Sequence, residues 1–144
     1  MLFGKKKRLI ERVLVVEDEP LVAFDTEHFL IGEGFHIVGT VNSVTSALAA
    51  LSEAEAIDLL LVDVHLSDGS GVEVARAARG RGIHVLFVTG HLPEEARALG
   101  SGCLSKPYPQ RDLLTAIAAI ERIIEGAKPP RRLPSSFSLF ANPA

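Results

Sequence analysis

Strand-length aliphatic runs set the first limit on the fold of this chain. Five of them stand in order at residues 13–16, 37–41, 59–62, 85–88 and 103–104. Most are unbroken rather than alternating with polar residues, which is typical of parallel strands covered on both faces. Because helix-like segments separate the runs, the sequence predicts a three-layer α/β sandwich with a five-stranded parallel sheet and right-handed crossovers.

Helical signals occupy the segments between these runs. Residues 43–54 and 71–79 are rich in Ala and interrupted by polar residues. Residues 20–32 open with Pro20, which is favoured in a first helical turn, and we expect this helix to present a broad apolar face. The members of that face are Leu21, Val22, Phe24, Phe29 and Leu30.

The last helix has the clearest period. Its apolar residues recur at steps of four, three and four, as on the buried side of an amphipathic helix. They are Leu113, Ile117, Ile120 and Ile124. Gly126, followed by Pro129 and Pro130, predicts where this helix ends.

Composition narrows the class of protein. The chain has 144 residues, with 15 basic and 18 acidic side chains and a formal net charge of −3. This size suits one domain that buries its own core, and the single cysteine, Cys103, excludes an internal disulfide framework. The acidic balance argues against direct DNA binding, and no apolar run approaches the roughly 20 residues of a membrane helix. We therefore expect a cytoplasmic protein without a membrane span.

Both ends of the chain differ from its middle. Residues 1–10 form a basic N-terminal segment that contains GKKKR, and we interpret it as a solvated charge run. The apolar stretch that follows is too short for a secretion signal. Residues 127–144 are rich in Pro and Ser without any periodic pattern, which predicts a disordered tail. The folded domain is therefore expected over residues 11–126.

Polar side chains follow the predicted strands at their carboxyl ends, where open parallel sheets bind ligands. They are Glu17, Asp18, Glu19, Asp63, Thr89, Ser105 and Lys106. Carboxylates brought close together raise one another's pKa unless a cation is present, and an all-oxygen ligand set suits Mg²⁺ better than zinc. One aspartate could attack a phosphoryl group and form an acyl phosphate, while the metal, lysine and threonine neutralise and orient that group.

Each of these residues also has a purely structural interpretation. Asp18 could cap the helix that begins at Pro20, and Asp63 could be a solvated residue at the end of its strand. Thr89 could be present for its β propensity, and Lys106 as a surface charge. For the site to be purely structural, all four of these explanations would have to be true at once. The combination of residues therefore favours a functional site.

Four motifs give the chain a resemblance to a known family. The order VLVVEDEP, LLLVDVHLSDGSG, VLFVTG and SKP resembles the receiver domain of two-component response regulators over about residues 11–126. The resemblance implies a (βα)5 flavodoxin-like, CheY-like sandwich. It further implies that Asp63 is the phosphoacceptor, Thr89 the switch hydroxyl and Lys106 the partner of the phosphate.

The same resemblance implies a metal site. Mg²⁺ would be held by Asp18, Asp63 and the backbone carbonyl of His65, with Glu17 acting through water. The bond between Lys106 and Pro107 is expected to be a cis peptide, a form that X–Pro bonds tolerate.

Two departures separate the chain from most receivers. Cys103 stands where receivers usually carry an aromatic switch residue. A lone cysteine in a strand is more often an unreactive core residue than a redox-sensitive thiol. The segment between Thr89 and Lys106 is short, which predicts a short or irregular helix over residues 93–99. With Gly90, the FVTG sequence resembles the stand-alone FAT GUY subgroup, although Val88 replaces its Ala and His91 stands where Gly or Tyr is expected.

The resemblance implies a single-domain response regulator. Such a protein accepts a phosphoryl group from a sensor histidine kinase or phosphotransfer protein and signals to a protein effector. It is no enzyme beyond Mg²⁺-dependent self-phosphorylation and autodephosphorylation. Since the segment after residue 126 is too short to fold into a DNA-binding domain, output is expected through protein contact, and homodimer formation is left open.

Two other classes of function compete with this reading. A small aspartate-nucleophile phosphohydrolase would use the same chemistry, but haloacid-dehalogenase-like motifs carry a second Asp two positions on, where this chain has His65. A pseudo-receiver would keep the fold as a binding module without being phosphorylated. The complete set of Asp18, Asp63, Thr89 and Lys106 argues against it.

Overall fold

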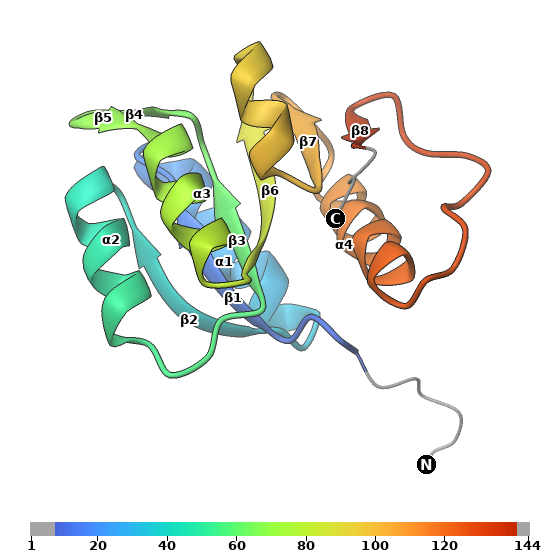
Figure 1. The fold of residues 1–144 in the computed structure, drawn as a ribbon, viewed down its shortest axis with the longest axis horizontal. Coiled ribbons are helices and arrows are strands. Elements are labelled where there is room, and N and C mark those ends of the chain that lie inside the picture. Colours follow the sequence, from blue (N-terminus) through green and yellow to red (C-terminus); the bar gives the residue numbers. More distant parts are fainter. Residues whose placement is uncertain (1–7, 141–144) are drawn as a thin grey trace.

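A computed structural model describes residues 8–140 of the chain (Figure 1). Its main sheet has six strands in the order β2-β1-β3-β6-β7-β8, in which the first five are parallel and β8 is antiparallel to β7. The strands are β1 (Arg12–Val16), β2 (His36–Val41), β3 (Leu59–Val62), β6 (His84–Thr89), β7 (Gly102–Ser105) and β8 (Phe137–Leu139). The α/β sandwich with its parallel sheet is thus confirmed, and one antiparallel edge strand is added to it.

The helices cover both faces of the sheet. They are α1 (Pro20–Gly32), α2 (Val44–Glu53), α3 (Gly71–Gly80) and α4 (Gln110–Ile124), with the 3₁₀ helix η1 (Glu94–Leu99) in place of a regular fourth helix. A two-stranded hairpin of β4 (His65–Leu66) and β5 (Gly69–Ser70) precedes α3. The short, irregular segment predicted over residues 93–99 is confirmed by η1.

Each central strand contributes to two separate cores, one on each face of the sheet. In β1, Leu14 and Val16 join the apolar cluster beneath α2 and α3, whereas Val13 and Val15 join the cluster beneath α1 and α4. All four side chains are at most 1% exposed. This two-sided burial explains why the strands read as unbroken aliphatic runs rather than as alternating ones.

The apolar face expected for α1 is wrong at two residues. Leu21 is 80% exposed and Phe24 is 58% exposed, while the residues of α1 that are buried are Thr26 and Leu30. The apolar residues of α1 are spread around the helix rather than gathered in one stripe, so only some of them can face the sheet. Ile124, expected on the buried stripe of α4, is likewise 38% exposed because the helix ends there.

The tail is folded over part of its length, contrary to the expectation of disorder. Phe137 and Phe140 are each 5% exposed, and β8 pairs with β7. The unpaired N–H and C=O groups of an edge strand favour pairing with another strand, and the composition of the tail gives no sign of this interaction. Residues 1–7 of the basic segment lie outside the part of the chain that is described.

Asp68 joins the loop after β3 to the start of α2. Its two carboxylate oxygens accept hydrogen bonds from the backbone N–H groups of Val44 (2.7 Å) and Thr45 (3.1 Å). These bonds lower the pKa of Asp68. Within residues 8–140, no helix combines the length and apolar character needed to cross a membrane.

Candidate functional site

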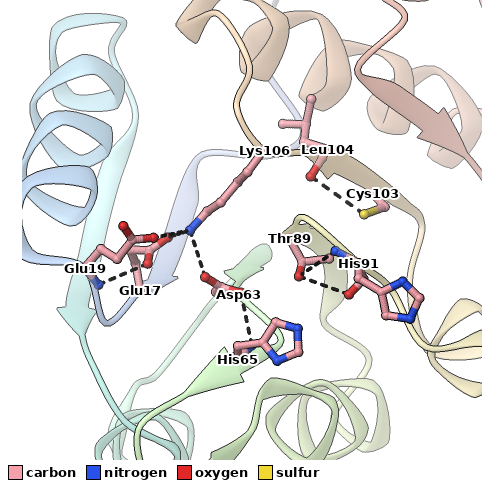
Figure 2. A network of polar contacts seen from close by, with 9 residues as sticks. All are labelled: Glu17, Glu19, Asp63, His65, Thr89, His91, Cys103, Leu104 and Lys106. Carbon is pink, nitrogen blue, oxygen red and sulfur yellow. Dashed lines mark hydrogen bonds and ion pairs between the residues drawn. The ribbon is translucent and has the colours of Figure 1, made fainter.

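The strand order places the site. The chain leaves β1 to one side to form β2 and returns to the other side of β1 with β3, so the carboxyl end of β1 lies at the topological switch point where such sheets bind ligands. Glu17 follows β1, Asp63 follows β3 and Lys106 follows β7. The three side chains converge at this edge of the sheet (Figure 2).

Lys106 is the centre of the polar network. Its Nζ lies 2.8 Å from Asp63 Oδ2, 2.6 Å from Glu17 Oε1 and 3.2 Å from Glu19 Oε1. The side chains of Asp63 and Glu17 are 8% and 6% exposed, so these two bonds run through a poorly solvated space. One ammonium group therefore balances two buried carboxylates and touches a third, exposed one.

The pKa directions follow from this burial. Burial alone would lower the pKa of Lys106, but its hydrogen bonds to Asp63 and Glu17 outweigh burial and raise that pKa above its ordinary value. Burial raises the pKa of Glu17, although its hydrogen bond to Lys106 opposes this shift. Lys106 is accordingly a permanent cation at neutral pH.

Asp63 is held from two directions. Its Oδ1 accepts a hydrogen bond from the backbone N–H of His65 at 3.0 Å, while its Oδ2 accepts the one from Lys106. Its own backbone N–H donates to the carbonyl of Val16 at 3.0 Å. Its carboxylate is therefore fixed in orientation, whereas the imidazole of His65 is exposed and takes no part in these bonds.

Carboxylates gather beside Lys106 in a set that suits a hard cation. One oxygen from each of Glu17, Asp18 and Asp63 can be chosen so that all three lie within 4.8 Å of one another. Asp18 does not cap α1, since the N-cap residue is Glu19 and no side chain caps that helix end. An all-oxygen set of this kind suits Mg²⁺ better than zinc.

Thr89 is attached to both sides of the site. Its backbone carbonyl accepts a hydrogen bond from the N–H of Lys106 at 3.1 Å. Its hydroxyl donates to the carbonyl of His91 at 3.1 Å and is turned toward the loop of Gly90 and His91 (Figure 2). Thr89 itself is 1% exposed, whereas Gly90 and His91 are exposed.

Two further residues flank Lys106 in the chain: Cys103 lies on β7, and Pro107 directly follows Lys106. Cys103 is buried in the core, and this burial raises the pKa of its thiol to about 11. Its thiol is therefore protonated at neutral pH, in keeping with inert core. The bond between Lys106 and Pro107 is cis, as predicted.

Two residues shape the site in ways that the sequence did not predict, although Glu19 was expected at this edge. Glu19 is the third carboxylate partner of Lys106. Gly71 packs against the backbone of Asp63 so closely that an added Cβ would lie 2.0 Å from the Asp63 carbonyl oxygen. Gly71 belongs to the DGSG motif, so only the spacing of that glycine from Asp63 could have drawn attention to it.

A groove opens beside Lys106, between α1 and the start of α4. Its volume is about 410 Å³. It is lined by Glu19, Val22, Asp25, Thr26, Lys106, Pro107, Tyr108 and Gln110. Because Lys106 lies in its wall, a molecule seated there would reach the edge of the network around Asp63.

Comparison with known proteins gives one consistent result. The response regulator receiver domain matches residues 13–118. The chain is 33% identical over 112 residues to the phyllosphere-induced regulator PhyR of Methylorubrum extorquens, covering 74% of this chain and 42% of that protein. It is 34% identical over 116 residues to the sensory transduction protein RegX3 of Mycobacterium tuberculosis, covering 76% of this chain and 50% of that protein. The chain thus spans about half the length of these relatives.

Solved structures agree with the sequence comparison. A CheY-like receiver domain protein from Methanospirillum hungatei superposes with a TM-score of 0.68 at 27% identity, over 81% of this chain and 98% of that one. The response regulator PhyR from Brucella abortus gives a TM-score of 0.67 at 26% identity, over 83% of this chain and 51% of that one. With its fold and the residues at its carboxyl edge, the chain belongs to the response regulator receiver domain family.

Proposed function

We propose that this protein accepts a phosphoryl group on Asp63 from the phosphohistidine of a sensor histidine kinase or phosphotransfer protein, and that it signals by contact with a protein effector. The observation that carries the proposal is the placement of Asp63. Its buried carboxylate stands at the end of β3 with one oxygen on Lys106 and the acidic residues alongside. Receiver domains are phosphoacceptor signalling domains, and this chain belongs to them.

The chemistry requires little besides positioning and charge neutralisation. An oxygen of Asp63 attacks phosphorus and forms the P–O bond of an acyl phosphate. The P–N bond to the donor histidine breaks, and the imidazole leaves with that electron pair and takes up a proton. Lys106, already 2.8 Å from Asp63 Oδ2, is placed to neutralise the oxygens of the transferred group.

Receiver domains generally bind Mg²⁺ at an acidic pocket, and the acidic cluster of this chain fits that ion. We propose that Asp18, Asp63 and the backbone carbonyl of His65 hold Mg²⁺ directly and that Glu17 holds it through water. When bound, the ion supplies positive charge to the phosphoryl oxygens. Self-phosphorylation from small phosphodonors and autodephosphorylation would take place at the same residues.

Phosphorylation changes the charge at Asp63, and Thr89 is placed to respond. The phosphoryl group itself carries about −1.5 to −2 charges at neutral pH, and it replaces the single negative charge of the Asp63 carboxylate. The Thr89 hydroxyl, which bonds to His91 in this structure, would turn to a phosphoryl oxygen. The loop of Gly90 and His91 would then lose that bond and move, and this movement would change the surface formed by η1 and β7. The change would need no aromatic switch residue at position 103, where this chain has Cys103.

The exposed side of α1 indicates that the phosphodonor is a protein rather than a small molecule. Leu21 and Phe24 are largely exposed, and the groove beside Lys106 begins on the next side of the same helix. Apolar side chains that face solvent together mark interaction surfaces. We therefore place the phosphodonor protein over α1 and the groove.

Variants of this surface test whether the phosphodonor is a protein that docks on α1. Leu21→Asp and Phe24→Ser should slow phosphotransfer from a cognate histidine kinase, found by profiling candidate kinases, at least tenfold. Neither variant should alter labelling by acetyl phosphate, because that small donor needs no docking surface. Glu53→Gln, at the exposed last residue of α2, serves as the control. A kinase that phosphorylates both variants at the wild-type rate would exclude α1 as the docking surface.

A further inference from the structure

The C-terminal segment covers the outer edge of the sheet. β8 runs antiparallel to β7 along its whole length, with Leu104 opposite Phe137 and Gly102 opposite Leu139 (Figure 1). Beyond the ladder, the N–H of Ser105 donates to the carbonyl of Ser136 at 2.8 Å, and the N–H of Phe140 donates to the carbonyl of Ser101 at 2.9 Å. The backbone groups of β7 are therefore satisfied by a short segment from the end of the chain.

Two aromatic side chains anchor this segment on opposite faces of the sheet. Phe137 belongs to the core cluster beneath α4, and Phe140 belongs to the cluster beneath η1 and α3. The guanidinium of Arg97 lies 4.4 Å from the centroid of the Phe140 ring. The edge thus accepts an extended segment that carries aromatic residues at its first and fourth positions.

Gly102 makes room for the first of these rings. A Cβ added at Gly102 would lie 2.6 Å from the ring of Phe137 and 2.7 Å from the carbonyl of Ser138. No side chain can stand there while the segment is in place. Gly102 and the two aromatic residues therefore form a site of defined shape rather than a loose contact.

Residues 137–140 are joined to the rest of the chain in a way that lets them detach from β7. β8 has three residues, and the ten residues before Phe137 that follow Gly126 form no regular secondary structure and are mostly exposed. Pairing of an extended segment with a free sheet edge is a common way for proteins to bind one another. The tether keeps the chain's own segment at an effective concentration on the order of millimolar, so a partner strand competes with it rather than finding the edge vacant.

Both ends of the segment contact elements that the chain joins to residues of the phosphorylation site. Ser105, bonded to Ser136, is the neighbour of Lys106. Arg97, stacked on Phe140, belongs to η1, which the loop of Gly90 and His91 connects to Thr89. Lys106 is thus one residue away from a contact of the segment, and Thr89 is joined to the other contact through the loop and η1.

We propose that the edge of β7 is a docking site for an extended segment of a partner protein with aromatic residues at its first and fourth positions. Residues 137–140 of this chain occupy that site in competition with the partner. Phosphorylation of Asp63 shifts the competition by loosening the segment, and this regulatory step rests on the function proposed above.

The test uses the full chain carrying Phe137→Ser and Phe140→Ser, which removes both anchors and leaves the edge intact. The probe is a fluorescent synthetic peptide with the sequence of residues 131–144. It should bind this double variant saturably and one to one, and bind the wild-type chain at least tenfold more weakly because that edge is filled. Adding Gly102→Val to the double variant should abolish binding, as should placing both Ser substitutions in the peptide. Failure of the peptide to bind a double variant that retains its circular dichroism would overturn the proposal.

Hydrogen exchange on the wild-type chain measures, without any substitution, how readily residues 137–140 detach from β7. The amides of Ser105 and Phe140 should exchange at least tenfold faster than those of the central strand β6, because the segment opens while the sheet stays folded. Equal rates would overturn the proposal, since the segment would then open only with global unfolding.

Addition of Mg²⁺ and beryllofluoride, which mimics the phosphorylated state, should raise exchange at the amides of Ser105 and Phe140 further. If acetyl phosphate labels Asp63 but beryllofluoride leaves this exchange unchanged, the regulatory step is wrong while the proposed function stands. If Asp63 is not labelled, the proposed function fails, and the peptide measurement still decides the docking site.

Discussion

At the scale of single residues, Lys106 determines the charge balance of the site. Its ammonium group contacts three carboxylates, and two of them are buried. Carboxylates at such close range repel one another unless a cation lies among them. The residue that we assign to the phosphate therefore also stabilises the site before any phosphate arrives.

Gly71 gives a prediction about stability. Gly71→Ala should lower the free energy of unfolding by about 1–3 kcal/mol, because the new Cβ would overlap the Asp63 carbonyl and force the backbone apart. Gly80→Ala in the same helix is the matched control, since nothing lies within 4 Å of its Cβ position. That control should be neutral or stabilising by up to about 1 kcal/mol. Urea denaturation measures both, and equal effects would show that the close contact at Gly71 is not limiting.

Cys103 gives a prediction about pH. Burial raises the pKa of its thiol from 9.0 to about 11, so its thiolate fraction at pH 8 is about a hundredfold below that of an unperturbed cysteine. Alkylation by iodoacetamide should be slow at pH 8 in the folded protein and rapid after unfolding. Because the unfolded chain loses the thiol proton near pH 9 and the folded one near pH 11, Cys103 should also make the protein less stable as pH rises through 9. The variant Cys103→Ala should lack this loss, and rapid alkylation of the folded wild type would contradict the buried placement.

Sequence patterns could identify some site residues and not others. Glu17 and Asp63 directly follow aliphatic runs, and Lys106 lies two residues after one, so the carboxyl-end rule for parallel sheets placed them together. Glu19 was expected at the same edge, but its contact with Lys106 depends on a side-chain rotamer. The contact of Gly71 with Asp63 is between backbones, and the spacing of the two residues is its only trace in the sequence. The resemblance of residues 87–90 to one receiver subgroup stays a prediction.

At the scale of elements, the loop after β3 is coupled to α2 by a single carboxylate. Asp68 accepts backbone hydrogen bonds from Val44 and Thr45, and these bonds lower its pKa. Asp68→Ala should reduce the Tm at pH 7, because two N–H groups at the helix start lose their acceptor. The pKa of Asp68 is depressed in the folded state, so its contribution is present above the ordinary value of 3.8 and is lost as pH falls below it. Thermal unfolding of both proteins at pH 7 and pH 3 measures this, and a Tm difference as large at pH 3 as at pH 7 would contradict the assigned role.

Elements were predictable where burial determined them. The five parallel strands lie where aliphatic runs predicted them, because strands covered on both faces must be apolar on both sides. Two failures have the same physical origin. Leu21 and Phe24 are apolar but exposed, and Phe137 and Phe140 lie in a Pro-rich and Ser-rich segment but are buried. Whether an apolar residue finds a neighbour depends on tertiary geometry, which local periodicity does not contain.

At the scale of the whole molecule, we assign the proposed phosphorylation to one edge of the sheet and the proposed regulation to another. The carboxyl edge assembles Asp63, Lys106 and the acidic cluster, and the outer edge is formed by β7 and β8. β7 belongs to both, because it ends at Ser105, directly before Lys106. This continuity is the path by which we expect a phosphoryl group at the first edge to change what binds at the second.

Labelling by acetyl phosphate with Mg²⁺, followed by intact-mass spectrometry and peptide mapping, tests the central claim most directly. The wild type should gain one phosphoryl group that is stable in acid and labile in base. Asp68→Asn, a matched change at an exposed aspartate five residues along the chain, should gain it as well, and Asp63→Asn should gain none. If Asp63→Asn acquires the same acyl phosphate, or the wild type acquires none, Asp63 is not the phosphoacceptor.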